Sequence, residues 1–219
     1  MAGADRPPLD GADHGVVDAF WQGRAGVEGP RAARFHGDHD PFDLAAIERL
    51  APAGGRMLDL GCGTCVIANR AVQELGLRVH AVDYVADFLA HAIDDERLTT
   101  AVGDVRTYVV GERFDLITSL GVITYLEPEE RAAMYGHCLA MLEASGALLV
   151  KAQFGVDETV RVDTWSEELD ARYRAVYPSL DEERALLEER FTVEVLDPYP
   201  PGFSRWENTH FHHLVARPR

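Results

Sequence analysis

Several features that would restrict the fold or the partner are scarce in this 219-residue chain. It has only three cysteines, and two of them, Cys62 and Cys65, share one glycine-rich loop, so no disulfide framework is predicted. No apolar run approaches the roughly 20 residues that cross a bilayer. Residues 1–15 also lack the apolar core of a secretory signal. These absences predict a soluble, cytoplasmic protein with no membrane partner.

Positive charge is also in short supply. The chain has 21 Lys and Arg against 37 Asp and Glu, which gives a formal net charge of −16 at pH 7. Proteins that bind nucleic acids usually present a basic face to the phosphates, so no nucleic-acid partner is predicted. What the chain does have is 47% hydrophobic and 26% charged residues, a composition that supports a buried core.

From residue 55 onwards, strand-like apolar runs alternate with helical patterns. The strand-like runs are RMLDL, RVHAVD, LTTAVGD, FDLITSL and ALLVKAQF, and the helical runs between them include CVIANRAVQEL and PEERAAMYGHCLAMLE. This alternation predicts βαβ units in an α/β fold, with a Rossmann-like, doubly wound and mostly parallel sheet. FTVEVLD and THFHHLVARP predict two further strands, and we expect the C-terminal strand to be antiparallel.

The remaining segments suggest how the domain is organised. Residues 1–40 are expected to form a flexible N-terminus and a helical lid, with VVDAFWQGR as a short amphipathic helix; the alternative is an ordinary helix pair packed on the sheet. Residues 41–219 are expected to form a single domain. Within it, residues 155–190 are predicted to be a helical insertion on the substrate side, with Trp165, Tyr173 and Tyr177 as wall residues.

Three acids end three successive predicted strands: Asp59, Asp83 and Asp104. In an open parallel sheet, ligands bind in the crevice at the carboxyl ends of the strands, so these carboxylates are expected to line one pocket. Gly61 and Gly63 follow the first acid and allow the backbone to turn sharply and to approach a ligand closely.

Two classes of ligand compete for this loop. A dinucleotide site requires a third glycine, but Val66 stands in its place, and Asp59 would repel a pyrophosphate. A cationic, hydroxylated ligand explains the acids better. Cys62 and Cys65 also form a C-x-x-C pair, typical of redox or zinc sites, but no second pair completes a zinc site, and no metal is predicted.

In order, LDLGCGTC, VHAVDY, AVGDV and FDLITSLGVITYLEP resemble four motifs of the class I S-adenosylmethionine-dependent methyltransferases, over roughly residues 55–153. The resemblance implies S-adenosyl-L-methionine as the cofactor. It implies that the first motif meets the methionine and ribose, the second acid meets the ribose hydroxyls, and the third motif meets the adenine. The cofactor-binding residues so implied are Asp59, Gly61, Gly63, Asp83, Tyr84, Asp104, Val105 and Leu120.

Methyl transfer requires mainly alignment and exclusion of water, and a base only where the nucleophile must lose a proton. The loop after the fourth strand lacks the Asp/Asn-Pro-Pro-aromatic motif and so resembles the small-molecule members of the family. The candidate catalytic residues are Tyr125 in that loop, Gln153 near the end of the fifth strand and His210 in the last strand. Arg34 is a candidate clamp for a carboxylate of the cofactor or substrate. For each residue, packing or surface exposure is the alternative.

The predicted function is therefore methyl transfer from S-adenosylmethionine to a small-molecule substrate, such as an amino acid, a sugar or another product of secondary metabolism. An alternative keeps the cofactor but attacks another of its carbons, by cyclisation of the methionine moiety or by aminocarboxypropyl transfer, and releases methylthioadenosine. A further alternative is a non-catalytic, cofactor-binding interaction protein. The acceptor and the oligomeric state are left open.

Overall fold

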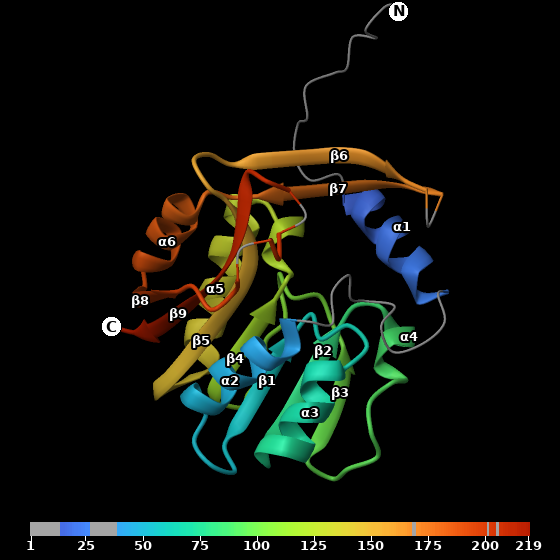
Figure 1. Ribbon diagram of the computed structural model, residues 1–219. Coiled ribbons are helices and arrows are strands. Elements are labelled where there is room, and N and C mark those ends of the chain that lie inside the picture. Colours follow the sequence, from blue (N-terminus) through green and yellow to red (C-terminus); the bar gives the residue numbers. More distant parts are fainter. Residues whose placement is uncertain (1–13, 27–38, 168–169, 201, 205) are drawn as a thin grey trace, which may run out of the picture.

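The computed structural model describes residues 14–26, 39–167, 170–200, 202–204 and 206–219. Helices and strands alternate along most of the chain (Figure 1). The helices are α1 (His14–Ala25), α2 (Asp40–Leu50), α3 (Val66–Leu75), α4 (Ala86–Leu89), the 3-10 helix η2 (Ile123–Tyr125), α5 (Pro128–Met141) and α6 (Leu180–Glu188). The strands are β1 (Arg56–Leu60), β2 (Arg78–Asp83), β3 (Leu98–Val102), β4 (Phe114–Leu120), β5 (Leu142–Gly155), β6 (Val160–Ser166), β7 (Ala171–Tyr177), β8 (Phe191–Leu196) and β9 (Thr209–Pro218).

Seven strands form the main sheet in the order β3-β2-β1-β4-β5-β9-β8. Strands β1 to β5 are mutually parallel, and β9 runs antiparallel to both of its neighbours, β5 and β8. The strand order reverses between β1 and β4, which is where an open α/β sheet forms its ligand crevice. The predicted doubly wound sheet with a C-terminal antiparallel strand is confirmed.

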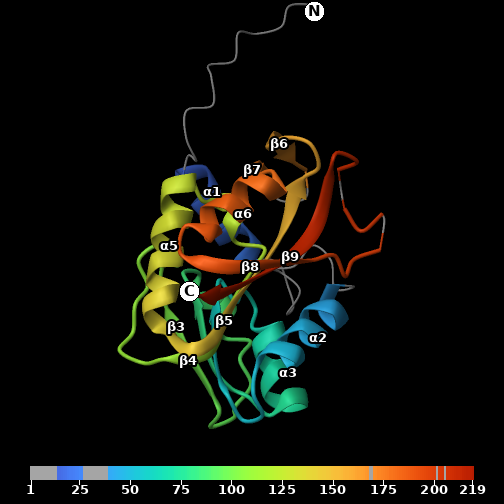
Figure 2. The ribbon, with the colours of Figure 1, turned by 90° about the vertical axis from the view of Figure 1, so that its left-hand side faces the viewer.

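Helices cover both faces of the sheet, α5 and α6 on one side and α2 and α3 on the other (Figure 2). Side chains alternate along each strand, so Leu58 packs in the core beneath α5 and α6, with Met134, while Met57 packs in the core beneath α2 and α3, with Ile47. Burial on both faces explains why these strands read as almost continuous apolar runs.

The segment after β5 corrects the sequence-based expectation. Residues 155–190 were predicted to be a helical insertion, but residues 160–166 and 171–177 form an antiparallel hairpin, β6 and β7; the helical prediction holds for α6, at Leu180–Glu188. Along β7 the burial alternates: Tyr173 and Tyr177 point inward, and Arg172 and Arg174 lie on the other face, each paired with Asp163 of β6. This period of two indicates a strand, whereas the density of charged residues had suggested a helix.

Helix α1 lies above the sheet, against β7 (Figure 1). The ring of Phe20 packs on Tyr173, with centroids 5.0 Å apart. The predicted helix from Val16 to Arg24 is thereby confirmed as part of α1. Arg34 falls outside the described residues. Among the helices that are described, none is both long and apolar enough to span a membrane.

Candidate functional site

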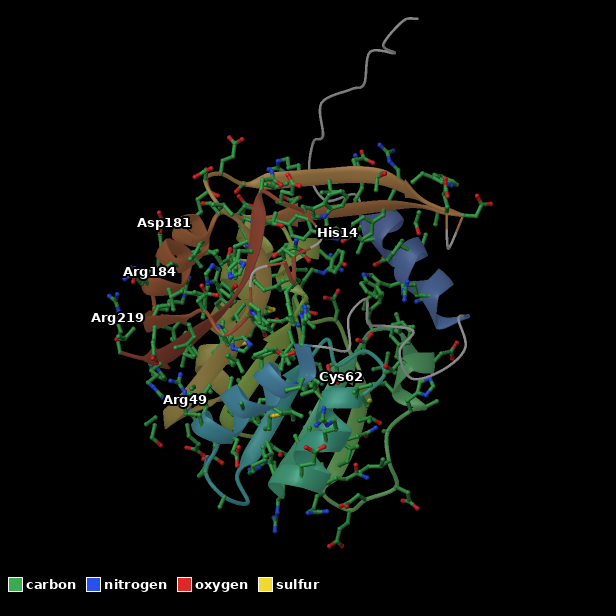
Figure 3. All side chains as sticks on the ribbon, viewed as in Figure 1. His14, Arg49, Cys62, Asp181, Arg184 and Arg219 are labelled. Carbon is green, nitrogen blue, oxygen red and sulfur yellow. The ribbon has the colours of Figure 1, made fainter. Side chains whose placement is uncertain are left out.

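A cleft runs along the carboxyl ends of the parallel strands and has two recesses. The β2 recess includes Asp83, Tyr84, Phe88, Asp104, Val105 and Arg106, and the β5 recess includes His39, Asp59, Lys151, Gln153, Tyr173 and Phe211. The two share a strip made of Trp21, Gly61, Gly63, Leu120, Gly121 and Tyr125. Figure 3 labels Cys62, which lies in the loop between β1 and α3 at this level. The strand order therefore brings the predicted acids to one edge, as expected.

The carboxylate of Asp83 is held by the backbone at the head of the β2 recess. Its Oδ2 accepts a hydrogen bond from Gly63 N at 2.8 Å, and its Oδ1 accepts one from Val85 N at 2.9 Å. Burial raises the pKa of Asp83, and these two N–H donors offset part of that rise. Asp83 therefore presents fixed acceptor oxygens and also holds the glycine loop against β2.

Two further predicted residues of the β2 recess differ in how their polar atoms are engaged. The buried hydroxyl of Tyr84 has no hydrogen-bond partner among the described residues. Asp104, by contrast, is paired with the guanidinium of Arg106, whose Nε lies 2.9 Å from both carboxylate oxygens. The side chain of Arg106 also contacts Glu130 at 3.2 Å. A ligand hydrogen-bonding to Asp104 would thus share that carboxylate with Arg106.

The loop after β1 requires glycine at its first position. Gly61 has φ +72°, and a Cβ there would overlap Cγ2 of Val122 in the loop after β4. Cys65 has φ +56° without being glycine, and it is fully buried at the start of α3. A left-handed backbone is costly for residues other than glycine, so Cys65 adopts this conformation at an energetic cost.

Replacement of Gly61 by alanine tests the packing of this loop. Gly54→Ala is the matched control because Gly54 has φ +69° but open space around its Cβ direction. Both variants share the cost of a left-handed backbone, and only Gly61→Ala adds the overlap with Val122. We expect Gly61→Ala to lower the free energy of unfolding by about 1–3 kcal/mol more than Gly54→Ala, as measured by urea denaturation. Equal losses would show that Val122 moves aside freely.

Asp59 and the two loop cysteines lie beneath the shared strip. Oδ1 of the buried Asp59 accepts a hydrogen bond from Oγ1 of Thr118 at 2.8 Å. The Sγ atoms of Cys62 and Cys65 are 3.8 Å apart. The contact with Cys65, burial and the charge of Asp59 raise the pKa of Cys62, which disfavours the reactive thiolate. Within the described ranges, no group of three or more His, Cys, Asp or Glu residues is placed to hold a metal ion.

Aromatic side chains form one wall of the β5 recess. The hydroxyl of Tyr125 lies 3.4 Å from that of Tyr173, which lies 3.0 Å from that of Tyr177. Two of these tyrosines come from the hairpin that replaces the predicted helix, so their predicted position in the wall agrees with the structure. Trp165, also predicted for the wall, is 58% exposed and belongs to the other strand of the hairpin.

A buried polar cluster borders the β5 recess at the end of β5. Asp43 of α2 is fully buried; its Oδ2 lies 3.3 Å from Nζ of Lys151, and its Oδ1 lies 3.0 Å from Nε2 of His213. The hydroxyl of Tyr199 donates to the same Oδ1 and lies 2.6 Å from His213 Nε2. The cluster fixes the ammonium group of Lys151 at the cleft.

The structure separates the predicted catalytic residues. Tyr125 and Gln153 both line the cleft, and the amide Nε2 of Gln153 donates to Oγ1 of Thr209. The structure does not place His210 with them at the cleft. His210 pairs with Asp197 at 2.7 Å and lines neither recess. Alternation along β9 is the reason, because Phe211 takes the cleft side and its neighbour must face the other way.

Sequence reasoning gave too little weight to two residues of the β5 recess. Lys151 was not among the predicted site residues, although its i, i+2 relation to Gln153 places both on one face of β5. It is 7% exposed and lines the cleft. His39, buried at the start of α2, lies with its ring against Phe211, at 4.5 Å between centroids. No periodic signal marked it, because it stands in loop-like sequence.

Comparison with known proteins agrees with this fold. Residues 57–146 match a family model described as a methyltransferase domain. No curated protein matches the sequence. Among solved structures, the glycopeptide N-methyltransferase MtfA is similar at 20% identity, with a TM-score of 0.66, over 88% of this chain and 100% of that one. A DhpI–SAH complex is similar at 19% identity, with a TM-score of 0.70, over 94% of this chain and 98% of that one. Streptomyces venezuelae DesVI is similar at 19% identity, with a TM-score of 0.63, over 94% of this chain and 99% of that one.

Proposed function

We propose that the chain is a class I S-adenosylmethionine-dependent methyltransferase and that it methylates a small-molecule metabolite held in the β5 recess; the match of residues 57–146 to a methyltransferase-domain model and the fold shared with MtfA and DhpI support this. The observation that carries the proposal is the junction of the two recesses along one shared strip. A cofactor in the β2 recess and an acceptor in the β5 recess would meet at that strip. Such an arrangement supplies alignment, which is the main requirement of an in-line methyl transfer.

The residues of the β2 recess fit the nucleoside part of S-adenosylmethionine. Asp83 offers acceptor oxygens of the kind that ribose hydroxyls bind, and Tyr84 has a buried hydroxyl without a partner among the described residues. Val105 lines the same recess, and its backbone would meet the ring edge of the adenine. Asp59, which lines the β5 recess beneath the shared strip, would face the methionine part. When bound, the cofactor supplies an electrophilic methyl group.

The chain's own residues would then orient the acceptor and exclude water. Trp21 of α1 lines both recesses, which supports the lid role predicted for the N-terminal segment. Gln153 is held by Thr209, so its amide is oriented before a substrate arrives. An apolar, aromatic recess with a few fixed polar groups is typical of sites for small molecules.

Tyr125 is proposed to contact the acceptor without acting as its base. Burial raises the pKa of Tyr125 well above its usual value, so the phenolate is disfavoured. We therefore expect Tyr125→Phe to lower kcat by less than about 10-fold, whereas loss of a general base costs roughly 100- to 10,000-fold. Steady-state kinetics with an identified acceptor measures this. A loss in the larger range would assign the proton transfer to Tyr125.

One incubation tests the proposed function. The protein is mixed with S-adenosylmethionine and pools of small-molecule acceptors, and the products are followed by mass spectrometry. S-adenosylhomocysteine and a methylated acceptor, formed only when an acceptor pool is present, are the expected result. Methylthioadenosine released without an acceptor would instead support attack on another carbon. Cofactor binding without turnover across broad pools would support the interaction protein.

A further inference from the structure

The amide of Gln153 indicates which kind of group on the acceptor is methylated, an inference that rests on the proposed function and deepens it. We propose that Oε1 of Gln153 accepts a hydrogen bond from the nucleophile itself, so that the acceptor is an amine or an alcohol with an N–H or O–H at the reacting atom. Thr209 is the positioning residue that turns this oxygen toward the β5 recess. Gln153 lies near the end of β5, Thr209 begins β9, and the two strands are neighbours in the sheet.

The hydroxyl proton of Thr209 already has an acceptor. Oγ1 of Thr209 lies 2.7 Å from the backbone oxygen of Trp206, and because a carbonyl oxygen can only accept, the hydroxyl must donate there. The same turn is closed by a backbone hydrogen bond from Thr209 N to Trp206 O at 3.1 Å. A hydroxyl has one proton, so toward Gln153 the Oγ1 of Thr209 can only accept a hydrogen bond.

This hydroxyl determines which end of the Gln153 amide faces Thr209. Nε2 of Gln153 donates to Oγ1 of Thr209. In the reverse orientation, Oε1 would face an oxygen whose proton is given to Trp206, and two acceptors would meet. That mismatch is costly here because Gln153 is only 6% exposed and Thr209 only 4%. Oε1 of Gln153 therefore lies on the side of the amide that faces away from Thr209.

Oε1 of Gln153 is the part of this amide that a ligand can use. Gln153 lines the β5 recess, and within the described ranges no donor is hydrogen-bonded to its Oε1. Polar atoms of residues buried to this extent are normally hydrogen-bonded, so an acceptor oxygen at the recess favours a ligand that brings a donor. The amide thus recognises an N–H or O–H of the acceptor.

A hydrogen bond to Oε1 aligns the nucleophile and leaves its proton in place, because an uncharged amide oxygen accepts hydrogen bonds but is not a base near neutral pH. In the transfer, the lone pair of nitrogen or oxygen forms the new bond to the methyl carbon. The pair of the breaking C–S bond stays on sulfur, which becomes a neutral thioether, and the N–H or O–H proton leaves to water. Holding that hydrogen on Gln153 restricts the direction of the lone pair, which is the alignment that the reaction requires.

The need for a hydrogen on the reacting atom limits the products. A primary amine, a secondary amine and an alcohol each carry a lone pair and a hydrogen on the same atom. A tertiary amine carries the lone pair when it is neutral and the hydrogen when it is protonated, but never both. Ethers and thioethers carry no such hydrogen. Methylation of an amine is therefore expected to stop at the tertiary stage, with no quaternary ammonium product.

The orientation of the amide can be measured by NMR without an acceptor. The chain has three glutamines, Gln22, Gln73 and Gln153, and the first two are exposed. With isotope-labelled glutamine and bound S-adenosylhomocysteine, we expect the side-chain N–H groups of Gln153 to exchange with solvent about 10-fold or more slowly than those of the other two. Gln153→Met identifies the signal by deleting it, and Thr209→Val should remove most of the protection. Protection that survives in Thr209→Val would overturn the assigned orientation.

Matched acceptor pools test the requirement for a hydrogen. One pool holds primary amines, secondary amines and alcohols, and the other holds tertiary amines, methyl ethers and thioethers with the same carbon skeletons. Each pool is incubated with the protein and S-adenosylmethionine, and the products are followed by mass spectrometry. We expect methylated products from the first pool alone, with amines ending at the tertiary stage. A quaternary ammonium, sulfonium or C-methyl product would overturn this proposal and leave the proposed function standing, whereas no methyl transfer to either pool would overturn the proposed function and this proposal with it.

Kinetics with an acceptor from the first pool assign the role of Thr209. Thr209→Val is expected to lower kcat about 5- to 10-fold, the scale of one hydrogen bond, with KM changed by less than about twofold, because the acceptor still binds but is misaligned. Thr209→Ser keeps the hydroxyl and should restore most of kcat. Thr100→Val is the matched control and should match wild type, since Thr100 is exposed on β3 and lines neither recess. Wild-type kcat in Thr209→Val, or a serine variant as slow as the valine variant, would show that Thr209 does not position Gln153.

Discussion

Replacing Asp43 by asparagine is expected to lower the free energy of unfolding by about 3–5 kcal/mol, the usual cost of removing one partner from a buried ion pair. Asp43 is fully buried. Its carboxylate contacts the side chains of Lys151 and His213 and accepts a hydrogen bond from the hydroxyl of Tyr199. Asparagine removes the negative charge that lies 3.3 Å from the ammonium of Lys151, in a site where that lysine is only 7% exposed. Urea denaturation at pH 7 measures the loss.

The difference between wild type and Asp43→Asn should also depend on pH. Burial raises the pKa of Asp43, but the charge of Lys151 and the hydrogen bonds from His213 and Tyr199 outweigh it, so the pKa lies well below the usual value. A lowered folded-state pKa stabilises the protein above the unfolded-state value, about 3.9. That contribution is lost as the pH falls from there through the folded-state pKa. The gap between the two proteins should therefore be full at pH 7 and should shrink below about pH 4.

Glu74→Gln is the matched control for this prediction. Glu74 pairs with Arg70 at i, i+4 on the surface of α3, with 49% of its side chain exposed. An exposed pair of this kind contributes little to stability, because water and salt screen it. If Asp43→Asn cost no more than Glu74→Gln, the buried cluster would not be a centre of stability, and α2 would be attached to the sheet by its apolar contacts alone.

The Asp43 cluster is a part of the structure that could not be predicted from the sequence. Asp43 and Lys151 are 108 positions apart, and Asp43 and His213 are 170 apart. Each residue has an ordinary local interpretation, as an acid in the first turn of a helix, a lysine at a sheet edge or a histidine in a strand. Only tertiary packing gathers them, and no local period or motif encodes which distant residues will meet.

The elements of the sheet were easier to predict because their signal is local. Apolar runs alternating with helical patterns indicated βαβ units, and the acids that end β1 and β2, Asp59 and Asp83, followed from the rule for parallel strands. The hairpin was missed because Arg172 and Arg174 made β7 look like a charged helix. His210 was misplaced because the sequence gives the alternation of a strand but not which face meets the cleft.

Replacing Asp83 by alanine is expected to weaken S-adenosylmethionine binding by about 1.5–3 kcal/mol, or about 10- to 150-fold in Kd. The carboxylate is only 6% exposed and lies in the β2 recess, so alanine removes acceptor oxygens from a site where water replaces them poorly. The variant also removes the acceptors of Gly63 N and Val85 N, which loosens the glycine loop. Isothermal titration with S-adenosylmethionine measures the combined effect.

Two further variants distinguish a role of Asp83 in binding the ligand from its role in supporting the glycine loop. Asp87→Ala removes an exposed acid from the neighbouring helix α4, and its Kd should stay within about twofold of wild type, since exposed substitutions away from a site have small effects. Asp83→Asn keeps one acceptor oxygen and should bind more tightly than Asp83→Ala. Should Asp83→Ala bind as well as Asp87→Ala while melting at a lower temperature, Asp83 would support the loop alone, and the ribose hydroxyls would be recognised by another group of the β2 recess.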